Sequence, residues 1–107
     1  MTSEKIRILN DRFRKTFIGG VVVKTQGISN LPEETQKKLF RLVKNYADFK
    51  ESNDPYGEHD FGVIHLEGND FIWKIDYYDL DMEYLSPDPS APNVTRRVLS
   101  ILCAGEW

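Results

Sequence analysis

His59 lies in the most chemically suggestive motif of the chain, NDPYGEHDFG (residues 53–62). Glu58 and Asp60 flank it, and the three residues lie between Gly57 and Gly62. An imidazole with carboxylates can carry out general acid–base chemistry or bind zinc or manganese. The first question is therefore whether these three side chains can act together.

The segment that follows predicts a β-hairpin. Two strand-like runs in EHDFGVIHLEGNDFIWKIDYYD (58–79) flank Gly68-Asn69, a dipeptide typical of a two-residue loop. With that loop, Ile64 would pair with Trp73 and Gly62 with Ile75 on one nearly apolar face. Since neighbouring strand residues alternate faces, His59 would point away from Glu58 and Asp60. The opposite face would collect His59, His65, Lys74, Asp76 and Tyr78.

The candidate catalytic group is consequently His59, Asp76, Tyr78 and Lys74. His59 would be the base and Asp76 would orient it, while Tyr78 or Lys74 would stabilise negative charge, as in a small hydrolase. Alternatively, His59 and Asp76 could bind a metal ion together, with Glu58, Asp60 or His65 as further ligands. However, the chain has no GxSxG, HExxH or CxxC motif. A structural hydrogen bond between His59 and Tyr78 is the alternative, and the leading interpretation requires no cofactor or metal.

An acidic stretch, DYYDLDMEYLSPD (76–88), interleaves carboxylates with tyrosines. Such a surface suits a protein partner with a basic surface, including one whose usual ligand is nucleic acid. The predicted contact residues are Asp76, Tyr78, Asp79, Asp81, Glu83, Tyr84 and Asp88. Alternatively, the stretch neutralises basic helices of the same chain.

Charge is divided unevenly along the chain. Residues 1–50 contain eleven Lys/Arg and five Asp/Glu, whereas residues 51–107 contain three and twelve, and the net charge is −3. Lys37, Lys38, Arg41 and Lys44 form a basic helix face, but the overall acidity argues against direct nucleic-acid binding.

Periodicity predicts the remaining elements. A helix over residues 3–17 would bury Ile6, Leu9, Phe13 and Phe17, and a strand would span 21–28. A second helix would begin at Ser29-Asn30-Leu31-Pro32 and bury Thr35, Leu39, Leu42, Tyr46 and Phe49. The prolines of 79–94 favour an extended loop, and residues 95–104 a last strand. We therefore expect an α+β fold, order α-β-α-β-β-β, with two amphipathic helices on one face of a mainly antiparallel sheet of about four strands.

Length and composition limit the class of protein. The 107 residues, 40% hydrophobic with 13 aromatics, suit a single domain over 1–107. No apolar run approaches the ~18 residues of a membrane span, and the charged N-terminus differs from a secretory signal, so we expect a cytoplasmic protein without membrane association. The single cysteine, Cys103, excludes an internal disulfide. The oligomeric state is not encoded in any of these patterns.

The blocks IRILNDRFR, GGVVVKTQGI, NDPYGEHDFG, FIWKIDYYD, SPDP and TRRVLSI, in this order, resemble a bacterial family known as domain of unknown function 3768. The resemblance implies a small protein frequent on plasmids and other mobile elements, and it implies no reaction or ligand. Genes in that setting often encode proteins that act on host defences. The leading hypothesis is thus a non-enzymatic binding protein, an inhibitor of a host defence complex of the anti-CRISPR or anti-restriction type, with the enzyme of His59 and Asp76 as the alternative.

Overall fold

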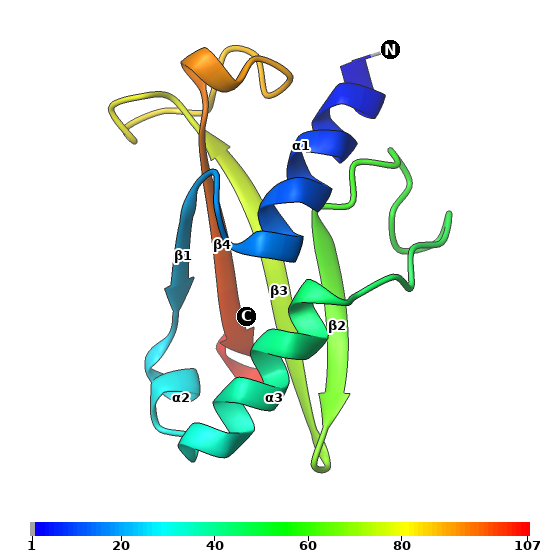
Figure 1. Ribbon diagram of the computed structural model, residues 1–107, viewed down its shortest axis with the longest axis vertical. Coiled ribbons are helices and arrows are strands. Elements are labelled where there is room, and N and C mark those ends of the chain that lie inside the picture. The colour runs from blue at the N-terminus through cyan, green and yellow to red at the C-terminus, as the bar shows by residue number, and fades with distance from the viewer. Residues whose placement is uncertain (1) are drawn as a thin grey trace.

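A computed structural model describes residues 2–107 as two layers, helices on one face of a four-stranded sheet (Figure 1). The elements are α1 (Thr2–Thr16), β1 (Val21–Lys24), α2 (Gln26–Ser29), α3 (Glu33–Lys44), β2 (Phe61–Leu66), β3 (Asn69–Tyr78) and β4 (Arg96–Cys103), with 3₁₀ turns at Pro92–Val94 and Ala104–Glu106. The α+β class is confirmed.

The sheet order is β1-β4-β3-β2. β2 and β4 both run antiparallel to β3, whereas β1 runs parallel to β4, so the sheet is mixed. Residues 26–28, expected to continue the first strand, belong instead to the short helix α2. The second helix ends at Lys44, before Tyr46 and Phe49, and buries Val43 rather than Leu42.

The hairpin differs from the predicted register. Its two-residue loop is Glu67-Gly68, both with positive φ, and Leu66 pairs with Asn69. Ile64 therefore lies opposite Phe71, and Trp73 lies opposite Gly62. Because the loop lies one residue earlier than predicted, the cross-strand partner of each residue changes by two positions. Side chains alternate with a period of two, so every residue of β2 and β3 keeps its predicted face of the sheet.

The core lies between the helices and the sheet. Its buried members are Phe13, Ile28, Leu39, Val43, Ile64, Phe71, Trp73, Ile75, Leu99 and Ile101. Trp73 is fully buried, as predicted. A side chain at Gly62 would overlap the Trp73 indole and the Tyr46 ring, so the close packing of these rings depends on glycine at this position.

No helix within residues 2–107 has the length and apolar character needed to cross a membrane. At one end of the sheet, opposite the β2–β3 turn, residues 79–95 form the loops that join β3 to β4 (Figure 1). The other end of the sheet carries the hairpin turn (Figure 1).

Candidate functional site

His59 precedes the sheet, because β2 begins only at Phe61. Its φ of 55° turns the chain toward the helical layer, and its ring stacks on Phe49 at a centroid distance of 3.7 Å and an interplanar angle of 3°. Nδ1 lies 2.8 Å from Oδ1 of Asp11 in α1. The prediction that His59 occupies a strand position facing away from the core is wrong, because strand alternation does not extend to a residue outside the strand.

Asp76 lies on the other face of the sheet. It alternates with Ile75 and Tyr77 along β3, and its carboxylate accepts a 2.9 Å hydrogen bond from Lys74 Nζ. Tyr78 shares that open face and forms a backbone bridge with Leu85. The structure therefore does not bring His59 together with Asp76, Tyr78 and Lys74.

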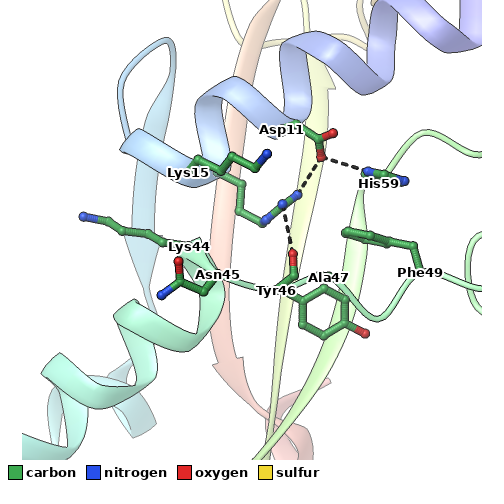
Figure 2. A pocket seen from close by; sticks show the side chains of 9 residues that line it. Asp11, Lys15, Lys44, Asn45, Tyr46, Ala47, Phe49 and His59 are labelled. Atoms are coloured by element: carbon green, nitrogen blue, oxygen red, sulfur yellow. Dashed lines mark hydrogen bonds and ion pairs between the residues drawn. The ribbon is translucent and has the colours of Figure 1, made fainter.

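Asp54 approaches His59 from the other side. Its Oδ1 accepts the His59 backbone N–H at 3.1 Å, and its Oδ2 lies 3.6 Å from Nε2 of the ring. Figure 2 shows this second nitrogen directed away from Asp11. Both ring nitrogens thus face carboxylates, an arrangement that leaves no nitrogen aimed at a substrate.

A hollow of about 460 Å³ opens beside this pair, between the last turns of α1 and α3 and the segment 45–49 (Figure 2). Arg14, only 1% exposed, donates to Asp11 Oδ1 at 2.9 Å and to the Tyr46 carbonyl at 3.1 Å. Its guanidinium also lies 5.2 Å from the Phe49 ring centroid. The Asp11 carboxylate therefore contacts both Arg14 and His59, and the Phe49 ring packs against each of them.

Glu58 takes part in a separate network under α1. Tyr77 donates its O–H to Glu58 Oε1 at 2.9 Å, and the Asn10 amide donates to the Tyr77 oxygen at 2.8 Å and to the Glu58 carbonyl at 3.0 Å. Asn10 Oδ1 in turn accepts from Arg97 Nε at 2.8 Å. Burial raises the pKa of Tyr77 and lowers that of Arg97, so the network holds a neutral phenol between charged neighbours.

Asp60 occupies an electrostatically unfavourable position. Its pKa is raised, first by burial and then by the nearby Glu58 carboxylate. Its backbone carbonyl accepts the Ile75 N–H at 2.8 Å, so the residue starts the β2–β3 ladder. Glu58, His59 and Asp60 thus have three different environments and form no common catalytic group.

The turn Asn53-Asp54-Pro55-Tyr56-Gly57 places these residues. Asn53 Oδ1 accepts the Lys50 N–H at 2.7 Å, the Gly57 N–H donates to the Asp54 carbonyl at 3.1 Å, and Gly57 has φ 67°. The prediction of a tight turn that directs the chain into the hairpin is confirmed. The Asp54 side chain bonds to the backbone five residues later, at His59, rather than two.

Three α1 residues were missing from the sequence prediction: Asn10, Asp11 and Arg14. Asn10 is fully buried where the predicted stripe had Leu9. Asn10 is four positions after Ile6 and three before Phe13, a spacing that places it on the apolar side of the helix. This spacing was the sequence signal from which its burial could have been predicted. Asp11 and Arg14, at i and i+3, resemble an ordinary surface ion pair, so sequence alone could not reveal their partner His59.

The acidic stretch begins with a rigid turn, which we call the tip loop (Asp79–Leu85). The Asp79 N–H donates to the Tyr84 carbonyl at 2.8 Å, and Asp79 Oδ1 accepts the N–H groups of Glu83 at 3.0 Å and Tyr84 at 3.4 Å. Large apolar side chains nevertheless face solvent: Leu80 (49% exposed), Met82 (44%), Tyr84 (73%) and Leu85 (77%). Asp81 and Glu83 are exposed between them.

The predicted contact residues divide into three groups. Asp76, Asp79 and Asp88 have intramolecular roles, since Asp88 accepts from the Ser90 N–H and hydroxyl at 3.1 and 2.6 Å and these bonds lower its pKa. Tyr78 is half-buried. Asp81, Glu83 and Tyr84 are exposed and form no side-chain hydrogen bond or ion pair within residues 2–107. The sequence prediction did not include Leu80, Met82 and Leu85, which are also exposed.

No group of three His, Cys, Asp or Glu side chains in the described part of the chain is arranged to hold a metal ion. Cys103 is half-buried beside Glu106, and burial raises the pKa of its thiol.

Fold and sites together define a small α+β protein with a rigid, exposed apolar and acidic loop and a polar cluster beneath its first helix. Residues 24–106 match the family described as protein of unknown function (DUF3768), and the chain belongs to this family. The match begins at Lys24, so α1 and its Asn10, Asp11 and Arg14 precede the matched region. Searches of curated proteins and of solved structures found no match to the chain.

Proposed function

We propose that the protein acts by binding another protein through the tip loop. The observation that carries the proposal is the exposure of four large apolar side chains on a turn that is rigid without a partner. Exposed apolar groups cost solvation free energy, and a contiguous group of them on a monomer commonly marks an interaction surface. A preorganised loop also loses little conformational entropy on binding.

The chemistry of the loop describes the partner. Tyr84 and Leu85 would enter an apolar depression, since buried aromatic anchors dominate binding energy. Asp81 and Glu83 would face basic side chains around that depression and accelerate association. In the mobile-element context that the family resemblance implies, a nucleic-acid-binding complex of host defence, of the CRISPR or restriction type, is the first partner to test.

Two exposed tyrosines provide a matched experiment. Tagged wild-type protein, Tyr84→Ala and Tyr56→Ala would be compared by capture of purified candidate complexes and by biolayer interferometry, since Tyr84 and Tyr56 are similarly exposed at 73% and 79%. We expect Tyr84→Ala to weaken binding at least ~30-fold, about 2 kcal/mol, and Tyr56→Ala to have little effect. Equal binding by both variants would contradict the proposal.

Charge is tested separately. The double variant Asp81→Asn/Glu83→Gln should slow association and reduce its dependence on salt, and Glu51→Gln should not. Asp79 must be left unchanged, because its carboxylate organises the loop.

The enzymatic alternative receives less support from the geometry. His59 and Asp76 lie on opposite faces of the sheet, and both His59 nitrogens face carboxylates. A binding function is therefore the better-supported proposal.

A further inference from the structure

The hollow beside His59 has features of a ligand site that the tip-loop function does not use. It lies at the junction of three segments: the last turn of α1, the end of α3 with residues 45–49, and His59 (Figure 2). Its volume of about 460 Å³ falls in the range of about 300–1,000 Å³ that is typical of small-molecule sites.

Positive charge predominates around the hollow. Arg14, Lys15 and Lys44 line it, and Asp11 is the one carboxylate among its lining residues. Arg14 and His59 both bond to Asp11, which neutralises only part of this charge. With a neutral imidazole the lining carries a net charge of about +2 when Lys44 is counted, and about +1 from Arg14, Lys15 and Asp11 alone.

Lys15 provides the accessible cation. It is exposed, and within residues 2–107 its amine has no hydrogen bond or ion pair. Figure 2 shows the amine extending toward Asp11 across the hollow, whereas Lys44 points outward. Lys44 instead lies over the Phe17 ring, 4.5 Å from its centroid.

Arg14 supplies an independent observation. The side chain is almost fully buried in the wall of the hollow, and its Nε has no hydrogen-bond partner in the described chain. Burying a guanidinium beside a single shared carboxylate is costly, and an anion in the hollow would offset that cost.

We propose that this hollow binds a small phosphate monoester. A phosphate group presents three acceptor oxygens to the ammonium and guanidinium groups, whereas a planar carboxylate presents only two. The phosphate would be bound by the Lys15 amine above the Arg14 guanidinium, and the organic group would contact Ala47 and the edge of Phe49. The volume accommodates a nucleotide-sized molecule but no folded macromolecule.

The test is an amide NMR titration of the full chain at fixed ionic strength with inorganic phosphate, adenosine monophosphate and a short single-stranded oligonucleotide. We expect saturable shifts confined to residues near 15, 45 and 47, with a Kd for the mononucleotide below ~1 mM. Lys15→Ala should weaken binding at least ~10-fold, and Lys15→Arg should largely retain it, because the cation is preserved.

Lys5→Ala is the matched control, since it removes the same charge from an exposed position of the same helix. If Lys5→Ala weakens binding as much as Lys15→Ala, general charge attraction explains the result and the proposal is wrong. Amide shifts that are spread over the whole chain or that do not saturate would contradict the proposed site. The proposal would also be wrong if the oligonucleotide bound more tightly than adenosine monophosphate and both Lys15→Ala and Lys5→Ala weakened that binding.

Discussion

Replacing Gly62 by alanine should destabilise the protein, although the change adds only one methyl group to a strand. In the register predicted from sequence, Gly62 faced Ile75, and alanine there would be tolerated. In the structure Gly62 pairs with Trp73, and an added Cβ would lie 2.7 Å from Trp73 Cε2 and 2.7 Å from Tyr46 Cζ.

Neither ring can move aside easily. Trp73 is fully buried, and Tyr46 packs edge-to-face on it with ring centroids 5.4 Å apart. Overpacking of this kind costs about 1–3 kcal/mol, and the reduced flexibility of the unfolded chain returns about 0.4–1 kcal/mol. We expect a net loss of about 1–2 kcal/mol in the free energy of unfolding.

Urea denaturation followed by circular dichroism measures this loss without depending on tryptophan fluorescence. Gly105→Ala is the control, because a Cβ there would meet nothing within 4 Å. The double variant Gly62→Ala/Trp73→Phe should lose about 1 kcal/mol less free energy of unfolding than the two single variants lose in sum. The reason is that phenylalanine leaves room for the methyl group of the new alanine. A Gly62→Ala protein as stable as Gly105→Ala, or strictly additive effects, would refute the observed pairing.

Three further predictions concern ionisable groups. Tyr77→Phe should lower the free energy of unfolding by about 1–3 kcal/mol in urea titrations, because Asn10 and Glu58 lose a buried partner; a neutral result would contradict the network. Asp60→Asn should raise the midpoint of urea unfolding at pH 7, because the raised pKa of Asp60 means that its ionised form opposes folding. Its advantage should shrink as the pH falls from the raised pKa toward the ordinary value of 3.8 and should be lost below it, and a lower midpoint at pH 7 would oppose this account. Glu106 accepts hydrogen bonds from Thr25 and from the backbone, which lower its pKa from 4.5 to about 2. Its stabilising effect is complete above about pH 4.5 and is lost as the pH falls through about 2. The free energy of unfolding of Glu106→Gln should therefore depend less on pH between about 5 and 2 than that of the wild type. An unchanged dependence on pH would contradict the stabilising role of ionised Glu106.

The sequence predicted the secondary structure well where its periodicity was strong. The helix starting near residue 3, the hairpin, the last strand and both faces of the hairpin follow from apolar spacing, a short-range property of the chain. The short helix α2 was not predicted. The predicted end of the second helix was wrong, because Tyr46 and Phe49 continue the helical spacing but pack on Trp73 from a non-helical segment.

The candidate sites were predicted less completely. The motif NDPYGEHDFG was recognised as a turn leading into the hairpin, and Asp81, Glu83 and Tyr84, predicted as partner contacts, are exposed in the structure. The partners of His59 were not, because Asp11 lies 48 positions earlier in the chain and only the packing of α1 over the sheet brings the two together.

The sequence by itself therefore determined the positions of the main helices and strands and which side of the hairpin faces the core, since these depend on local periodicity. Tertiary structure decided the strand order, the pairing of Gly62 with Trp73, and the position of β1 beside β4. It also decided that Asp79 organises the tip loop while its apolar neighbours remain exposed. These features depend on the fit between segments distant in sequence and on which polar groups find partners, and no local pattern encodes either.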